Sequence, residues 1–342
     1  MQVDLAPNEM EESFLNWLVT YGSILSPKIQ FCNDDSQGRG VIATDDIDTD
    51  EDLFFIPYDC CIYADPNDEM INEHEWLPLM IKIYNECRLD NYQPYLQLIP
   101  QVDCPMTWTD EEQKLVELIL PIGSEESLQL FHKLNEFVDC SIEEFYFIGC
   151  FIMAYSFSYS YIVMIPMADM LNHHSQHNCQ LFEVEGGYAM RAIQPIPAGC
   201  ELYNTYGGLS NIDLLLKYGF VEQHNPYEQG WLNEYLGLQT HAEDEEQLVE
   251  YIDVEDEQLG ELENDEDVDL QNPESMDLEA ANDIESDKGM DARSEVVEYM
   301  EALDLILQTD LENDRIGKLQ YIAGTHKQLL GMWLESGQLI EE

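Results

Sequence analysis

Residues 164–226 have the sequence MIPMADMLNHHSQHNCQLFEVEGGYAMRAIQPIPAGCELYNTYGGLSNIDLLLKYGFVEQHNP, and this stretch decides the fold. It places amide, imidazole, phenol and glycine groups between apolar segments of the kind that form strands. Asn172-His173 lies near its start, and Tyr206-Gly207 follows one hairpin later. Because buried polar groups need partners, this mixture is difficult to explain as core filling. The stretch predicts a site for a cationic ligand and a polar substrate side chain.

The chain is strongly acidic. Its 342 residues hold 13 Lys+Arg against 71 Asp+Glu, a net charge of −58, and residues 241–290 alone hold 21 acids and one base. A field of this sign repels nucleic acid and anionic lipid and attracts basic proteins. Solubility or a salty habitat explains the charge equally well. We expect a basic protein partner and no direct contact with nucleic acid or membrane.

Cysteine usage indicates a reducing compartment. Nine cysteines are present, an odd number, and no C-x-x-C pair marks a zinc cluster. The first residues are acidic, unlike a secretory signal, and no apolar run reaches membrane-spanning length. We therefore expect a protein of the nucleus, the cytoplasm or both.

Apolar periodicity divides the chain into segments. Residues 10–65 and 161–230 favour strands, whereas residues 66–160 show helical spacing and form a helical insertion. A weak internal repeat aligns ATDDIDTDEDL (43–53) with AIQPIPAGCEL (192–202), which suggests one β-rich module split by that insertion. Strands are expected at 53–57, 162–166, 181–184, 188–193 and 200–206, and helices at 8–20 and 145–155.

The C-terminal third has a different composition. Residues 241–290 are low-complexity acidic sequence, and we expect a disordered linker because they cannot bury enough apolar surface to offset chain entropy. Residues 291–342 form a short helical region, with amphipathic helices at 294–309 and 315–335.

Gly38-Arg39-Gly40 is expected as a loop that enters a strand. Its two glycines permit positive φ and let main-chain N–H and C=O groups face a ligand. Taken alone, the triplet is better explained as a plain turn. No third glycine follows, so the triplet is not a dinucleotide fingerprint.

Asn172-His173 is the next candidate. An Asn side chain accepts from an ammonium with its oxygen while its nitrogen ties down backbone. A local turn capped by the Asn is the alternative. His173, His174, His177 and Cys179 lack a second ligand cluster, so loop histidines are favoured over a metal site.

Aromatic residues gather near the end of the last expected strand. Tyr203, Tyr206, Tyr218 and Phe220 offer faces that stabilise a sulfonium or methylammonium by cation–π attraction. Core packing is the alternative, and it is favoured for Phe220. Polar or amphipathic groups also stand in apolar contexts at Trp76, Tyr155, Ser156 and Asp169.

These motifs together resemble the SET-domain protein methyltransferases. The motifs are Gly38-Arg39-Gly40, Ala168-Asp169-Met170-Leu171-Asn172-His173, Tyr203-Asn204-Thr205-Tyr206-Gly207 and Tyr218-Gly219-Phe220. Their order and the helical insertion are similar to the Rubisco large-subunit methyltransferase class, and within it to the subgroup of ribosomal lysine methyltransferase 4 and SET domain-containing protein 6. The resemblance covers about residues 10–230. It implies an α+β fold, a β-rich SET fold of small sheets with a pseudoknot, a helical insertion and a short C-terminal helical region.

The resemblance also implies S-adenosylmethionine as the cofactor, and roles for named residues. Gly38, Arg39 and Gly40 contact its methionine part through backbone groups, and Asn172 and His173 hold its amine and adenine. Tyr155 closes over the cofactor, and Tyr206 is the catalytic tyrosine beside the transferred methyl group. Trp76, Ser156 and Asp169 line the substrate side, and Tyr218 and Phe220 complete an aromatic wall. No metal is expected.

The implied activity is methylation of a lysine in a basic protein, such as a ribosomal protein, by a monomer. Two alternatives stay open: methylation of histidine, and an acidic binding protein or chaperone on a SET scaffold. The chain departs from the family in its short C-terminal region and in the short link between Phe157 and Ile162. Both departures bear on substrate identity.

Overall fold

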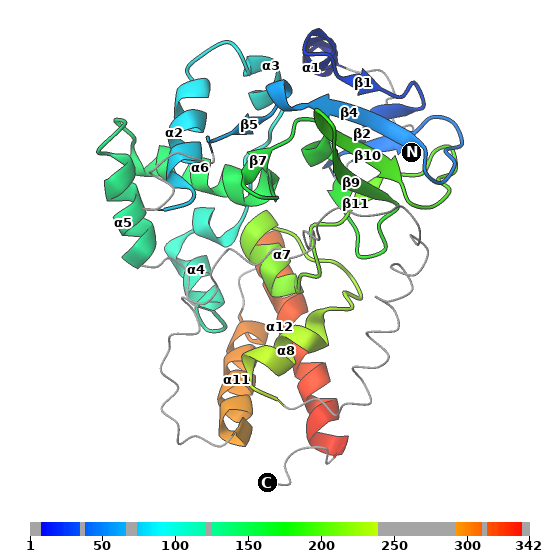
Figure 1. The fold of residues 1–342 in the computed structure, drawn as a ribbon. Coiled ribbons are helices and arrows are strands. Elements are labelled where there is room, and N and C mark those ends of the chain that lie inside the picture. Colours follow the sequence, from blue (N-terminus) through cyan, green and yellow to red (C-terminus); the bar gives the residue numbers. More distant parts are fainter. Residues whose placement is uncertain are drawn as a thin grey trace, which may run out of the picture. The chain divides into compact units, whose positions relative to one another are not determined.

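The computed structural model describes residues 8–34, 38–65, 74–120, 125–238, 292–309 and 313–336 (Figure 1). The chain forms two compact units. The first comprises residues 1–113 and 122–224, and the second comprises residues 114–121 and 225–342. The candidate site lies in the first unit.

A four-stranded antiparallel sheet forms the centre of the first unit. Its order is β1 (Ile24–Leu25), β4 (Asp52–Pro57), β10 (Gly187–Ala192) and β9 (Cys179–Val184). The middle pair, β4 and β10, aligns Phe55 with Ala189. Strands from the two β-rich segments therefore share one sheet, although the whole helical insertion separates them in sequence (Figure 1).

Three smaller sheets complete the β structure. β2 (Ile29–Asp34) pairs with β3 (Gly38–Ala43), and β8 (Asn172–His173) pairs in parallel with β11 (Tyr203–Asn204). The third sheet has the order β5 (Ile62–Tyr63), β7 (Ile162–Met164) and β6 (Ser156–Ser158). Small sheets mixed with helices confirm the α+β expectation.

Two of the expected strand boundaries are wrong. Gly38-Arg39-Gly40 is part of β3 rather than a loop before it, because each of these residues faces a partner on β2. The expected strand at 200–206 shrinks to β11, with Glu201 forming an isolated bridge to Ile42. Here the chain changes partners from β3 to β8, which no local pattern reveals.

The two halves of the weak internal repeat pair with each other. Ile47 and Ile196, aligned in the sequence, form an antiparallel bridge. The Ala43 amide donates to the Cys200 carbonyl at 2.9 Å, and the Asp50 amide donates to the Ala192 carbonyl at 2.8 Å. Their common pattern of strand, polar turn and strand thus lets the two segments meet face to face.

Helices occupy the segment between β5 and β6, and one helix precedes the first strand. They are α1 (Glu9–Thr20), α2 (Leu77–Glu86), α3 (Gln93–Leu96), α4 (Asp110–Val116), α5 (Glu125–Leu134) and α6 (Ile142–Tyr155), with short 3₁₀ turns η1 (Tyr58–Cys60), η3 (Pro105–Thr107) and η4 (Ala168–Met170). The predicted helix at 8–20 is confirmed: Asn8 caps α1 in a reciprocal capping box with Glu11. Ser141 and Glu144 begin α6 in the same way.

The core of the first unit joins helices to sheet. Phe14, Leu53, Tyr95, Met164 and Tyr188 are all fully buried in one apolar cluster. Each such side chain contributes about 1.5–3 kcal/mol when removed from water. The cluster therefore fixes the strands that carry the candidate site against the helical insertion.

A helix that the sequence analysis did not predict follows the aromatic motif. α7 (Asn211–Tyr218) begins at Ser210, whose hydroxyl accepts from the Asp213 amide while the Asp213 carboxylate accepts from the Ser210 amide. It ends at Gly219, which adopts φ +78°. Tyr218 therefore stands at the end of a helix and not beside a strand.

The second unit is helical. It contains α8 (Glu228–Tyr235), α11 (Ala292–Leu307) and α12 (Asp314–Ser336). The two predicted C-terminal helices at 294–309 and 315–335 are confirmed, whereas the predicted linker at 241–290 lies outside the described residues. Within the described ranges, every helix is too short or too polar to cross a lipid bilayer.

Candidate functional site

Asn172 connects three segments that are distant in sequence. Its Nδ2 donates to the Arg39 carbonyl on β3 at 3.1 Å and to Glu201 Oε1 at 2.7 Å. Both amide protons are therefore used inside the protein. No donor among the described residues reaches the amide oxygen, which remains an acceptor for a ligand.

Gly40 makes this junction possible. A Cβ at this position would lie 2.4 Å from Glu201 Oε1 and 3.0 Å from Asn172 Nδ2. Any side chain would therefore displace one of these groups. Gly38 differs, because a Cβ there meets no atom within 4 Å, and its φ of +79° is what favours glycine.

His173 is a neutral, buried imidazole. Its Nδ1 accepts from the Tyr206 amide at 3.0 Å, which places the proton of the neutral ring on Nε2. Nε2 faces Glu222 Oε2 at 3.5 Å, too long for a good hydrogen bond. Burial lowers the pKa of His173 to about 4, although the Glu222 charge raises it. The ring thus holds the Tyr206 backbone in place without carrying charge near neutral pH.

Glu222 fixes the loop that follows Asn172-His173. Its Oε1 accepts from the Ser175 amide at 2.9 Å and from the Ser175 hydroxyl at 2.8 Å. Its backbone exchanges two hydrogen bonds with the Asn211 side chain at the start of α7. The end of the Tyr218-Gly219-Phe220 segment is therefore tied to the loop after β8.

Three of the four predicted aromatic residues, Tyr206, Tyr218 and Phe220, lie together beside His173, whereas Tyr203 packs against His174. The Tyr206 centroid lies 5.1 Å from His173, 4.7 Å from Tyr218 and 6.3 Å from Phe220. The Tyr206 hydroxyl donates to the Leu171 carbonyl at 2.9 Å. Burial raises the pKa of Tyr206 well above its ordinary value. The phenol therefore stays protonated, with its lone pairs available to accept.

Asp169 is a carboxyl group held in apolar surroundings. Its Oδ2 accepts from the Tyr95 hydroxyl, whereas its Oδ1 is buried without a partner. Burial raises its pKa to about 7, and the Arg39 charge opposes that shift. Just before it, Met167 adopts φ +79°, a strained conformation for a residue other than glycine.

Arg39 extends from β3 towards the helical insertion. Its guanidinium donates to the Leu98 carbonyl, and its Nε is buried without a partner. Its charge is close enough to lower the pKa of Tyr155, which burial nevertheless raises to about 12. Tyr155, the last residue of α6, is thus placed near Arg39 and Asp169.

Trp76 and Ser156 are less closely connected to this group. Ser156 begins β6 and pairs with Met164, directly after Tyr155. The Trp76 amide donates to His74 Nδ1 at 3.1 Å, and Trp76 stands just before α2. In the described part of the chain, no hydrogen bond or ring contact joins Trp76 to the other predicted residues.

Three contributors to the site were not predicted: Glu201, Glu222 and Tyr95. Glu201 precedes the Tyr203–Gly207 motif and Glu222 follows Phe220. Their closeness in sequence to predicted site residues is the one signal that could have identified them. Tyr95 lies in the helical insertion and carries no comparable signal. The histidines, Cys179 and the carboxylates of the described residues form no metal-binding group.

The family model named "SET domain" matches residues 38–207 of this chain. The N-lysine methyltransferase SETD6 of Bos taurus is 29% identical over 256 residues, which is 62% of this chain and 57% of that protein. SETD6 of Homo sapiens is 28% identical over 232 residues, 55% of this chain and 49% of that protein. The chain thus spans about half the length of the curated relatives that it matches.

Solved structures share the fold. The SET domain of LSMT bound to lysine and AdoHcy superimposes with a TM-score of 0.52 at 20% identity, covering 65% of this chain and 59% of that one. Rubisco LSMT bound to sinefungin and monomethyllysine gives 0.52 at 21% identity, covering 64% and 57%. At this identity the likeness concerns the architecture alone.

Proposed function

We propose that this chain transfers a methyl group from S-adenosylmethionine to a lysine side chain of a protein. The premise is that it is a SET-domain protein of the Rubisco large-subunit methyltransferase class. The observation that carries the proposal is the junction of Gly40, Asn172 and Glu201. This junction leaves the Asn172 amide oxygen as an acceptor beside β3, where Asn172 and Glu201 lie close to the backbone of Gly40.

The residues present fit the cofactor. Asn172 Oδ1 and the Glu201 carboxylate offer acceptors for its ammonium group, and the backbone of residues 38–40 lies beside them. His173 is neutral, so its segment can present backbone groups to an adenine edge without bringing a charge. When bound, S-adenosylmethionine supplies an electrophilic methyl group on a positively charged sulfur.

The aromatic residues supply the electrostatics of the site. The faces of Tyr206, Tyr218 and Phe220 stabilise a sulfonium by cation–π attraction, which strengthens where water is excluded. Because Tyr206 stays protonated and donates to Leu171, it orients an amine through its lone pairs and does not act as a phenolate base. The lysine loses its proton beforehand, which desolvation of an amine favours.

A basic protein is the proposed substrate, and a ribosomal protein is one example. The net charge of −58 supports this because opposite charge raises the rate of encounter. The curated relatives carry lysine methyltransferase names, which favours lysine over histidine. We place the protein in the nucleus or cytoplasm, consistent with nine free cysteines, and propose that it acts as a monomer.

The test is label transfer by the full chain. Labelled S-adenosylmethionine is incubated with the protein and a ribosomal-protein fraction, and the labelled residue is identified. Asn172→Ala is expected to weaken cofactor binding at least about tenfold, which corresponds to about 1.4 kcal/mol. Tyr206→Phe is expected to preserve cofactor binding and to lower kcat at least about tenfold, since the amine loses the hydroxyl that orients it. The Leu171 carbonyl also loses a donor in this variant.

Matched variants control for damage to the fold. Tyr84→Phe removes a hydroxyl that lies outside the site. Like the Tyr206 hydroxyl, it donates to a backbone carbonyl, here that of Asp139. In Asn85→Ala an exposed amide on α2 is removed. Both are expected to behave as the unaltered protein. Absence of both cofactor binding and transfer would contradict the proposal, and label on histidine would correct its substrate residue.

A further inference from the structure

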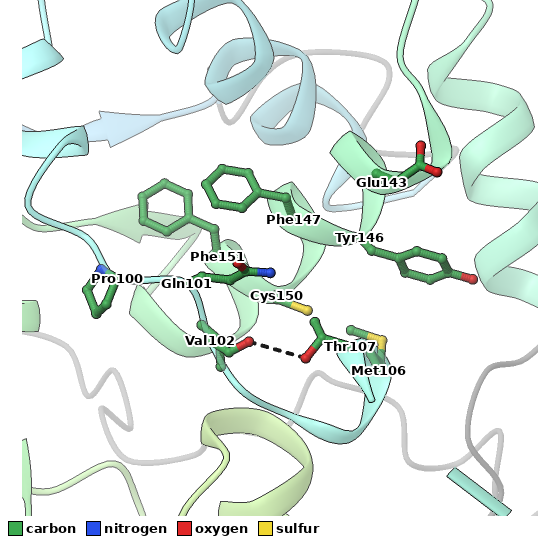
Figure 2. Close-up of a pocket in the computed structure, with 10 residues that line it drawn as sticks. All are labelled: Pro100, Gln101, Val102, Met106, Thr107, Glu143, Tyr146, Phe147, Cys150 and Phe151. Atoms are coloured by element: carbon green, nitrogen blue, oxygen red, sulfur yellow. Dashed lines mark hydrogen bonds between the residues drawn. The ribbon is translucent and has the colours of Figure 1, made fainter. Parts of the chain in front are cut away.

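A cavity of about 190 Å³ lies between residues 100–107 and α6 (Figure 2). Val102, Met106 and Thr107 line one side, and Phe147, Cys150 and Phe151 line the other. None of these residues belongs to the predicted cofactor or substrate set. The thiol of Cys150 is therefore reachable by a small solute, although the residue is only 3% exposed.

Cys150 does not stand alone at the cavity. Its Sγ lies 3.5 Å from Sγ of Cys104, which is fully buried on the segment that leads into η3. The hydrogen bond with Cys150 lowers the pKa of Cys104 below its ordinary value. Cys104 thus has the greater thiolate character of the pair, and Cys150 has the access.

The segment that carries Cys104 also supports the candidate cofactor site. The carbonyl of Leu98 accepts from the Arg39 guanidinium. A Cβ on Gly219 would lie only 2.2 Å from the Asp103 carbonyl oxygen, so α7 ends directly against this segment. Tyr155 packs against the small apolar cluster that contains both cysteines. Arg39 and Gly219 therefore contact one short stretch of backbone, and Tyr155 packs against the cluster that this stretch shares with α6.

We propose that Cys104 and Cys150 are a thiol-oxidation site for small hydroperoxides, and that their disulfide alters the neighbouring cofactor pocket. The Cys104 thiolate takes the proton of the Cys150 thiol, and the Cys150 sulfur, which faces the cavity, attacks one oxygen of hydrogen peroxide. The O–O bond breaks, and the hydroxide released takes up a proton to leave as water. The sulfur of Cys104 then displaces the hydroxyl of the sulfenic acid on Cys150, and this hydroxyl leaves with the Cys104 thiol proton as a second water. Two thiols are oxidised by two electrons, and one peroxide is reduced to two waters.

The disulfide requires movement. The two sulfur atoms must close from 3.5 Å to about 2.0 Å, which draws the segment around Cys104 towards α6. Leu98 and Asp103 lie on that segment. The hydrogen bond from Arg39 to the Leu98 carbonyl and the packing of Gly219 against the Asp103 carbonyl therefore change together. The expected consequence is weaker binding of S-adenosylmethionine, and this part of the inference rests on the proposed function.

The experiment treats the full chain with hydrogen peroxide and follows three quantities. Mass spectrometry of peptic peptides measures the Cys104–Cys150 cross-link, hydrogen exchange reports on residues 98–107, and calorimetry gives the affinity for S-adenosylmethionine. We expect the cross-link to form, exchange in 98–107 to change, and the cofactor Kd to rise at least about threefold. Dithiothreitol is expected to reverse all three.

Variants separate this pair from the other thiols. Cys104→Ala and Cys150→Ala, each small enough for a buried position, are expected to abolish the response to peroxide. Cys87→Ser with Cys200→Ser removes the exposed thiols and is expected to keep it. Failure to form the cross-link, or a cross-link with unchanged exchange and affinity, overturns the proposal. A different result is that peroxide forms the cross-link but the untreated, reduced protein does not bind the cofactor. That result rejects the proposed function and leaves the oxidation site established.

Discussion

At the scale of single residues, Asn172 determines the geometry of the candidate site. Its two amide protons join the backbone of β3 to the carboxylate of Glu201. A buried acceptor that loses its donor costs about 1–3 kcal/mol, and more if it is charged. Gly40 is subject to the same geometry, because a side chain there would occupy the place of the Glu201 carboxylate. These residues therefore form one unit that tolerates little change.

Asp169 carries a prediction for the pH dependence of stability. Burial raises its pKa from 3.8 to about 7 in the folded chain. The folded protein thus binds this proton more tightly than the unfolded chain does, and folding loses free energy as the pH rises through that interval. We expect Asp169→Asn, which retains an acceptor for the Tyr95 hydroxyl, to gain on the order of a few kcal/mol at pH 8 and almost nothing at pH 4.

Urea unfolding of both proteins between pH 4 and 8 measures this difference. Asp48→Asn serves as the control, since Asp48 is exposed. A difference between Asp169→Asn and the unaltered protein that does not depend on pH would contradict the assignment.

The residues of the site were predictable to different degrees. Asn172, His173 and Tyr206 were chosen as candidates because amide, imidazole and phenol groups stand where apolar strands are expected and because their order resembles the SET family, and the structure brings the three together. Glu201 and Glu222 were missed because acids are abundant in this chain, and only tertiary pairing distinguishes these two. Trp76 was assigned to the substrate side by resemblance alone, and the described contacts leave that assignment a prediction.

At the scale of elements, helices with a clear apolar period were predictable. α1, α11 and α12 lie within two residues of their expected bounds. α7 was missed because Tyr218 and Phe220 were grouped with a strand, although Ser210 and Asp213 form a capping pair and Gly219 ends the helix. Pairing also decided the strands: β3 includes Gly38–Gly40 only because β2 lies beside it.

The end of α7 offers a test of close backbone packing. Gly219 has φ +78°, and a Cβ there would lie 2.2 Å from the Asp103 carbonyl oxygen. Gly199 has a similar φ of +86° with no atom within 4 Å of a Cβ. We expect Gly199→Ala to cost about 1–2 kcal/mol, the penalty of a left-handed conformation. Gly219→Ala should cost at least about 2 kcal/mol more, because backbone must move.

Thermal and urea unfolding of the two variants compare these costs. Equal destabilisation of Gly199→Ala and Gly219→Ala would mean that the contact with Asp103 does not constrain α7. A cofactor affinity reduced only in Gly219→Ala would further support the role of the 98–107 segment.

The helical unit is held by a buried polar chain. His326 on α12 bonds to Glu228 Oε2 at 2.8 Å and to the Tyr299 hydroxyl at 2.7 Å, and Trp231 stacks on its ring. Removing one partner of a buried ionisable pair typically costs about 3–5 kcal/mol. We expect His326→Ala to destabilise α8, α11 and α12 by an amount of this order.

Hydrogen exchange localises the effect. Protection should fall in residues 292–307 and 314–336, with β9 and β10 as an internal reference. His132→Ala, on α5, is the control and should leave both regions unchanged. Loss of protection in β10 equal to that in α12 would show that the two units unfold as one.

At the scale of the whole molecule, the net charge of −58 would make encounter with the proposed basic substrate sensitive to salt. Screening shortens the range of this attraction to about 3 Å at 1 M ionic strength, from about 10 Å at 0.1 M. We expect kcat/KM for a basic peptide to fall steeply over that interval while kcat changes little. A peptide with the same target lysine but neutral flanks is the control, and equal salt dependence of both peptides would exclude steering by charge.

The junction at Asn172 also has a consequence for the order in which the chain is made. The Arg39 carbonyl is synthesised before its donor Asn172, which lies 133 residues later in the chain. The loop after β8 is likewise synthesised before its partner Glu222. At about 5–20 residues per second, β3 leaves the ribosome roughly 10–40 seconds before the last of these segments exists. Closing so long a loop adds little to the free energy but slows folding. A nascent chain shorter than about residue 222 therefore has the strands that carry the candidate site without the site itself.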